Sequence, residues 1–196
     1  MPLDDRCSEV RGKYSGRLLI CGSARCIWDD LSIYQFGERE GVASIVFDGD
    51  VMVVNDIGMH LGCPIHHWYS NDWEMLPRWV AARRPLSAVT DVNILTHSCY
   101  GGADYVWPWH GGGTSGLNAV FTALALGYSE ITLAGIPLDD AGHYFDPPWQ
   151  RTNFTNEVPS DNEEIKYWSK AAKESFQGKV KSLSGRTKAI LNPDGY

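Results

Sequence analysis

Five short apolar or β-branched runs, separated by helical or loop segments, constrain the fold of this chain more than any other feature of its sequence. They are residues 17–21, 51–55, 65–69, 92–96 and 130–135. Parallel strands that are buried on both faces read as continuous apolar runs, and the second, fourth and fifth runs do so. Such strands are usually joined by helical crossovers. We therefore predict an α/β fold of the Rossmann-like kind, with a mainly parallel sheet and helices on both faces.

The clearest helical segment begins at Thr114 or Ser115 and ends at Gly127. Its apolar residues follow one another at spacings of 3, 1 and 3, which places them on one face. They are Leu117, Val120, Phe121 and Leu124. A hydroxyl at the start and a glycine at the end are the capping residues that the unsatisfied backbone groups of helix termini need. Both ends of this helix are thus predicted from local sequence.

The length of the chain predicts one domain. A length of 196 residues allows one core of ordinary size, so we predict a single Rossmann-like domain over residues 1–196. Further helices are expected at about 75–84 and 163–177, and a last strand at 179–183. Residues 139–160 mix glycine, proline and aromatic residues without a periodic stripe. Since long unstructured connections are uncommon in compact domains, we predict a lid loop there.

Composition excludes several classes of protein. The net charge is −7, which disfavours a duplex nucleic acid partner, and no apolar run approaches the roughly 18 residues that cross a bilayer. The first 14 residues are too polar for a signal peptide, so we expect a cytoplasmic protein without a membrane partner. The five cysteines are scattered, which favours free thiols over a metal site. An open sheet edge is compatible with a homo-oligomer.

The strongest local signal for a ligand is the glycine-rich turn at residues 111–116. Three glycines followed by Thr-Ser-Gly at a helix start expose backbone N–H groups, and the helix dipole adds partial positive charge. Phosphate is the ligand that such a turn is suited to bind. A tight strand-to-helix turn that needs glycine only for its backbone conformation explains the pattern equally well. No Lys follows, and no well-placed acidic residue does, so kinase-type and dinucleotide-binding motifs are disfavoured.

Polar residues also follow several of the predicted strands. The carboxyl ends of parallel strands meet at the edge where open α/β folds bind ligands, although each such residue alone is more often a cap or turn residue. Asp139, just past the fifth strand, could orient a substrate hydroxyl or cap a turn. The predicted nucleotide-binding residues are Gly22, Ser23, Asn55, Thr96, Ser98, Gly113, Thr114, Ser115, Gly116 and Asp139.

Three of the six histidines are candidate general acids or bases. His97, His110 and His143 flank the predicted site or its lid, and imidazole titrates near neutral pH. His66 and His67 are adjacent in a strand and cannot face the same way, so we expect one of them to be buried and hydrogen-bonded. No metal site is predicted.

One stretch of the chain resembles a known family. Residues 114–136, with Thr-Ser-Gly at the start and Ala-Leu-Gly-Tyr-Ser-Glu-Ile-Thr-Leu-Ala-Gly-Ile at the end, resemble the corresponding stretch of bacterial lipooligosaccharide sialyltransferases. They are also similar to a wider superfamily that contains flagellin-modifying glycosyltransferases and 6-hydroxymethylpterin diphosphokinase-like proteins. Residues 180–187 are similar to small phage-encoded members of that group.

The resemblance implies a metal-independent Rossmann-like domain whose nucleotide pocket is lined by Gly22, Ser23, Asn55 and the segments 96–98 and 114–116. Two departures weaken the inference of activity. Ser23 stands where the sialyltransferases carry Asn, and residues 159–168 hold no histidine where the family has its catalytic one.

We expect a metal-independent, nucleotide-sugar-dependent glycosyltransferase, with no cofactor besides its nucleotide-activated donor. One alternative is a phage-type protein that binds and sequesters a nucleotide-like small molecule without turnover. Another is a diphosphokinase of the pterin type, which would need Mg²⁺ and a carboxylate cluster. Asp56, Asp139 and Asp140 are loose candidates for that cluster.

Overall fold

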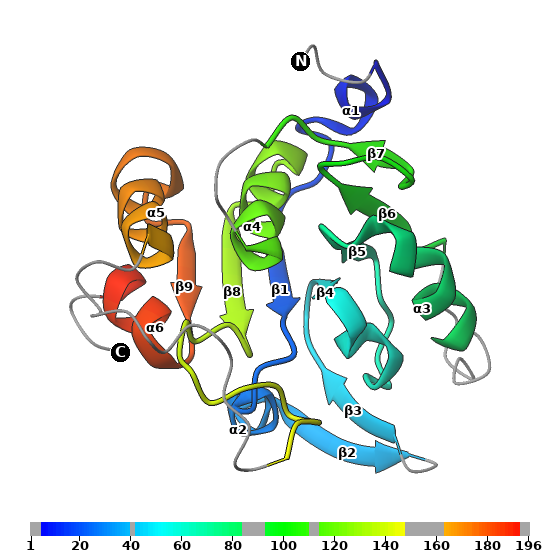
Figure 1. The fold of residues 1–196 in the computed structure, drawn as a ribbon, viewed down its shortest axis with the longest axis vertical. Helices are drawn as coiled ribbons and strands as arrows, with labels where there is room; N and C mark the ends of the chain where they lie inside the picture. Colours follow the sequence, from blue (N-terminus) through cyan, green and yellow to red (C-terminus); the bar gives the residue numbers. More distant parts are fainter. Residues whose placement is uncertain (1–4, 40–41, 84–92, 110–113, 148–162, 193–196) are drawn as a thin grey trace.

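The computed structural model describes residues 5–39, 42–83, 93–109, 114–147 and 163–192. In these residues the chain forms a seven-stranded sheet in the order β7-β6-β5-β4-β1-β8-β9, and every neighbouring pair is parallel (Figure 1). The strands are β1 (Arg17–Cys21), β4 (Asp50–Val54), β5 (His67–Tyr69), β6 (Leu95–Ser98), β7 (Tyr105–Val106), β8 (Glu130–Ala134) and β9 (Val180–Ser182). β1 lies between β4 and β8, with Ile20 opposite both Met52 and Leu133.

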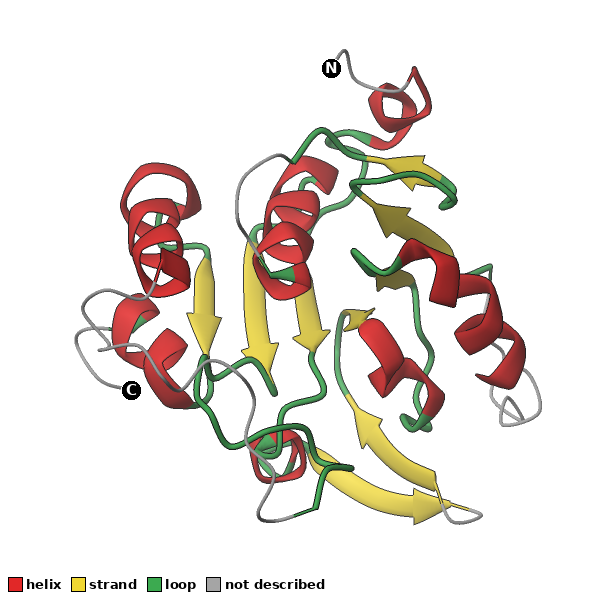
Figure 2. Ribbon diagram, in the orientation of Figure 1, coloured by secondary structure: helices red, strands yellow, loops and turns green. Residues whose placement is uncertain are grey.

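Helices cover both faces of the sheet (Figure 2). One face packs against α1 (Asp5–Val10), α4 (Ser115–Leu126), α5 (Glu163–Ala171) with the π-helical turn Ala172–Phe176, and α6 (Gly185–Leu191). The other packs against α2 (Ile27–Leu31), the 3-10 turns Asn55–Met59 and Trp73–Met75, and α3 (Leu76–Arg83). β1 supplies alternate residues to the two apolar cores, Leu18 to one and Leu19 to the other. The Rossmann-like α/β prediction is confirmed.

The order of the strands positions the site. From β1 the chain moves outward through β4, β5, β6 and β7, and it then returns to place β8 on the opposite side of β1. The direction of winding therefore reverses between β1 and β8. In open α/β sheets, ligands bind at the carboxyl ends of the strands that flank such a switch point.

Most elements follow the sequence prediction. The six predicted strands are present as β1, β4, β5, β6, β8 and β9. α4 has Thr114 as its N-cap and Gly127, at φ 113°, as its C-cap. The antiparallel hairpin of β2 (Gln35–Arg39) and β3 (Val42–Val46), β7, α1 and α2 were not predicted. These elements are two to six residues long, too short for a periodic pattern. Of the predicted lid, residues 139–147 form an irregular loop, and residues 148–160 lie outside the described part.

A chain of hydrogen bonds runs through buried side chains on the α4 face of the sheet. Trp107 Nε1 donates to His97 Nδ1 at 3.1 Å, and His97 Nε2 lies 3.0 Å from His67 Nδ1. His67 Nε2 lies 2.9 Å from the hydroxyl of Tyr128, which donates to Asp50. Since an indole N–H can only donate, His97 accepts at Nδ1 and, as a neutral ring, donates from Nε2. Each later bond then has one possible direction, and both imidazoles are neutral.

Burial opposes a positive charge on either ring of this chain. It lowers the pKa of His67 to about 4 and holds the pKa of His97 well below its ordinary value. Both side chains are fully buried, which confirms the expectation that one residue of the 66–67 pair is internal and hydrogen-bonded. Among the described residues, no helix has both the length and the apolar composition that a bilayer crossing requires.

Candidate functional site

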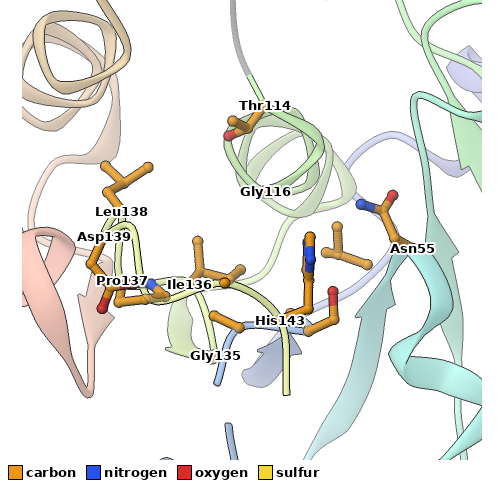
Figure 3. A pocket seen from close by; sticks show the side chains of 14 residues that line it. Asn55, Thr114, Gly116, Gly135, Ile136, Pro137, Leu138, Asp139 and His143 are labelled. Carbon is orange, nitrogen blue, oxygen red and sulfur yellow. The ribbon is translucent and has the colours of Figure 1, made fainter. Parts of the chain in front are cut away.

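A pocket lies at the carboxyl ends of β1, β4 and β8, at the switch point of the sheet (Figure 3). Three turns and the start of α4 form its walls. The lining residues are Gly22, Ser23 and Ala24 after β1, Val54 and Asn55 at the end of β4, Thr114 and Gly116 at the start of α4, and Gly135, Ile136, Pro137, Leu138, Asp139, Gly142 and His143 after β8. The fold thus places the pocket where a Rossmann-like sheet binds its ligands.

The turns after β1 and β8 touch at the pocket, where two glycines meet. Gly22 N donates to Ala134 O at 2.8 Å, and the backbone N of Gly135 donates to the buried carboxylate of Asp30 at 2.8 Å. A Cβ on Gly22 would stand 2.5 Å from the carbonyl oxygen of Gly135, and a Cβ on Gly135 would overlap the carbonyl oxygen of Gly22. Gly135 also has φ +66°, which L side chains rarely adopt. This close approach therefore needs glycine on both sides.

We expect Gly135→Ala to lower the free energy of unfolding by about 2 kcal/mol, because it adds steric overlap to a left-handed backbone. Gly178→Ala is the matched control, since Gly178 has φ +75° but nothing within 4 Å of an added Cβ. Its cost should be about 1 kcal/mol or less. Urea unfolding of both variants measures the difference, and equal losses would contradict the close approach at the pocket.

The loop after β8 is fastened to the turn after β1 by Arg25. Its Nε donates to Ala141 O at 2.9 Å, and a terminal nitrogen donates to Asp146 O at 3.2 Å. The backbone adds to this fastening, because Tyr144 N donates to Ser23 O at 3.0 Å. Bonds from a charged guanidinium are stronger than neutral ones, so the loop has a fixed position over this side of the pocket.

His143 stands on this loop with an acidic partner. Its Nδ1 lies 3.0 Å from Asp146 Oδ2, and the same oxygen accepts from the backbone N of His143 at 2.8 Å. The backbone N–H of His143 is the largest cause of a lowered pKa at Asp146, so this carboxyl is ionised and only accepts. Nδ1 therefore carries a hydrogen, which leaves the lone pair of a neutral imidazole on Nε2.

The imidazole of His143 is open to the pocket. Figure 3 shows this side chain directed into the pocket between Ile136 and Asn55. It is 44% exposed, and the ring of Phe145 stacks on it with the centroids 5.1 Å apart. A nitrogen lone pair that is oriented by a carboxylate and faces a ligand pocket is what a general base requires.

The start of α4 offers the pocket a site for an anion. Thr114 caps the helix by accepting from Leu117 N at 3.4 Å, and Gly116 brings the first turn against Ile136, 3.1 Å from where a Cβ would stand. The first N–H groups of a helix lack partners within the helix, and the dipole makes that end partially positive. The described lining contains no Lys or Arg, so backbone and neutral donors would hold the anion there.

The structure brings most of the predicted site residues together. Those that line the pocket are Gly22, Ser23, Asn55, Thr114, Gly116, Asp139 and His143. His110 and Gly113 lie outside the described residues. Arg25, Gly135, Ile136 and Asp146 were not predicted as part of the site. Only the spacing of Asp146, three residues after His143, offered a signal in the sequence.

Four predicted residues do not line the pocket. Thr96 bonds to the carboxylate of Asp104, Ser98 Oγ accepts from Tyr100 N, and Ser115 Oγ accepts from Asn71 N. His97 is fully buried with both ring nitrogens hydrogen-bonded, and it is therefore not a candidate base. Thr96, His97 and Ser98 do not reach the pocket because of the strand order. They lie on β6, which is separated from β1 by β4 and β5.

Within the part of the chain that the structure describes, no three His, Cys, Asp or Glu side chains form a group that could hold a metal ion. Asp139, one of the loose candidates for such a cluster, instead accepts from Ala141 N at 3.0 Å through one carboxylate oxygen.

Comparisons with known proteins support the fold. No protein-family model and no curated protein sequence matches the chain. Among solved structures, the chain is similar to the sialyltransferase CstII from Campylobacter jejuni in complex with a substrate analogue, cytidine-5'-monophosphate. The TM-score is 0.55 with 16% sequence identity, over 86% of this chain and 79% of that chain. At this identity the similarity establishes a shared fold, and it does not bear on the resemblance to phage-encoded proteins.

Proposed function

We propose that this chain is a glycosyltransferase that uses a nucleotide-activated sugar, and that the nucleotide is a cytidine monophosphate. The observation that carries the proposal is the pair His143–Asp146, which presents an oriented base to a pocket at the switch point of the sheet. The similar fold of a sialyltransferase that was solved with cytidine-5'-monophosphate supports the choice of nucleotide.

The proposed step is a direct transfer. His143 Nε2 takes the proton of an acceptor hydroxyl while the acceptor oxygen bonds to the anomeric carbon of the donor sugar. The bond from that carbon to the phosphate oxygen breaks, and its electron pair leaves with the nucleotide. Asp146 supports the step by stabilising the imidazolium that forms.

The start of α4 is suited to the leaving phosphate. Negative charge increases on the phosphate as the bond breaks, and the helix N-terminus with the Thr114 and Gly116 turn would stabilise it. Ser23 and Asn55 lie on the walls formed by the turns after β1 and β4, and they would contact the rest of the nucleotide.

Ligand binding tests the proposal first. At a concentration of cytidine-5'-monophosphate about 100 times its Kd, we expect the Tm to rise by about 5 °C or more. Adenosine and uridine monophosphates are the matched controls, and EDTA should not change the shift. Binding of none of these nucleotides would contradict the pocket assignment.

Turnover separates the main proposal from its first alternative. After incubation with a cytidine-monophosphate sugar and candidate acceptor sugars, mass spectrometry should find the nucleotide released and a glycosylated acceptor. Tight binding with the donor recovered intact would instead indicate a protein that sequesters a nucleotide-like molecule. The diphosphokinase alternative rests on the sequence resemblance, and a binding shift that requires Mg²⁺ would favour it.

A further inference from the structure

The side chain of Asn55, on one wall of the pocket, is held by three constraints. Its backbone has φ 59°, a left-handed conformation that Asn adopts more readily than most residues. Its carbonyl oxygen accepts from Trp68 Nε1 at 2.6 Å, and its Oδ1 accepts from Ser70 Oγ at 2.8 Å. The position of this amide is therefore set before any ligand binds.

Ser70 decides which end of that amide faces the pocket. Ser70 is fully buried, and its Oγ accepts from the backbone N of Asp72 at 2.9 Å. A backbone N–H can only donate, so the hydroxyl hydrogen of Ser70 needs a separate acceptor, and Asn55 Oδ1 supplies it. In the reverse orientation the amide nitrogen would meet that hydrogen, and the described bonds of Ser70 Oγ include no second acceptor for it, which is costly in a buried position.

We infer that Ser70 is a positioning residue that fixes Asn55 as a hydrogen-bond donor toward the ligand. Figure 3 shows the side-chain nitrogen of Asn55 on the side of the pocket and its oxygen turned away. The ligand atom that meets Asn55 is therefore an acceptor, such as a hydroxyl, carbonyl or phosphate oxygen, and an amino group is disfavoured there. This inference deepens the proposed function and rests on it for the identity of the ligand.

The neighbouring strand provides a matched control. Ser98 is also fully buried at a strand end, and its Oγ accepts from Tyr100 N just as Ser70 Oγ accepts from Asp72 N. Ser98 does not line the pocket and has no bond to Asn55 among those described. Ser70→Ala and Ser98→Ala therefore remove the same kind of turn contact, and only the first frees the Asn55 amide to rotate.

Calorimetric titration with cytidine-5'-monophosphate measures the effect on the ligand. We expect Ser70→Ala to raise Kd about five- to tenfold and Ser98→Ala to leave it within about twofold. Asn55→Asp should raise Kd at least about tenfold, since it replaces the donor by a carboxylate oxygen. In the Asn55→Asp background Ser70→Ala should have no further effect, because a carboxylate has no donor end to orient. Equal effects of the two serine variants, or additive effects of Ser70→Ala and Asn55→Asp, would overturn the inference.

A measurement without ligand keeps this test separate from that of the proposed function. The side-chain amide protons of Asn55, followed by ¹H–¹⁵N NMR, should exchange rapidly with water in the wild type because they face an open pocket. In Ser70→Ala the amide resonances should shift or divide into two populations. Protected Asn55 amide protons in the wild type would overturn the role of Ser70. Failure of the wild type to bind cytidine-5'-monophosphate, with the NMR result as expected, would contradict the proposed function alone.

Discussion

Replacement of His143 by asparagine is expected to lower the rate of glycosyl transfer by about 10²- to 10⁴-fold, because this change removes the nitrogen that takes the acceptor proton. Asparagine can still donate to Asp146, so the loop should keep its position. The Kd for cytidine-5'-monophosphate should change by less than about threefold, since a general base acts on the acceptor. Initial rates at saturating donor, together with calorimetry, measure both quantities.

Two further variants test whether the loss of rate belongs to the His143–Asp146 pair. Asp146→Asn should lower the rate about 10- to 100-fold, because the carboxylate that orients the imidazole and stabilises its charged form is lost. His60→Asn is the control, since His60 is an exposed imidazole beside Tyr144 that does not line the pocket. His60→Asn should transfer at the wild-type rate. A wild-type rate in His143→Asn would show that another group is the base.

Acidification from pH 7 to pH 4 should remove about 3 kcal/mol of the free energy of unfolding through His67 alone. In the unfolded chain this imidazole takes up a proton near pH 6.5, whereas in the folded protein it does so only near pH 4. Between these values the unfolded state binds more protons than the folded state. The contribution of His67 to the free energy of unfolding is therefore complete above pH 6.5 and is lost as the pH falls toward 4. The lowered pKa of His97 acts in the same direction.

Urea unfolding at several pH values between 7 and 5 measures this effect. Burial raises the pKa of Glu164 to about 7, so this carboxyl titrates over the same range in wild type and variants alike. His67→Phe removes the titrating ring, so it should be less stable at pH 7 but should lose less stability on acidification. His60→Asn is the control, because His60 is exposed beside Tyr144 and has no described contact with the buried chain. An unchanged pH dependence in His67→Phe would show that the buried chain does not cause the acid sensitivity.

Several parts of the molecule depend on local sequence and were predicted from it. The ends of α4 are set by a hydroxyl at Thr114 and a left-handed glycine at Gly127, which act within one turn of the backbone. The strands β1, β4 and β8 are runs of apolar residues that can only be buried between two layers of helices. Because parallel strand ends share an edge, Gly22 and Asn55 could be assigned to one pocket.

Tertiary structure decided the remaining features of the site. Strand order placed β6 away from the switch point, and residues 96–98 therefore do not reach the pocket. The sequence offered three histidines as bases, and only the folded chain shows His97 buried and His143 oriented by Asp146. The contacts of Arg25 with the loop after β8 join segments more than 100 residues apart.

The sequence by itself determined the fold class, the capped helix and the set of strand ends from which a pocket could be built, because these follow from periodicity and backbone preferences over a few residues. The tertiary structure alone decided which strand ends meet, which histidine faces the pocket and which end of the Asn55 amide does so. Those outcomes depend on hydrogen bonds and packing between distant segments, and a local pattern carries no information about such partners.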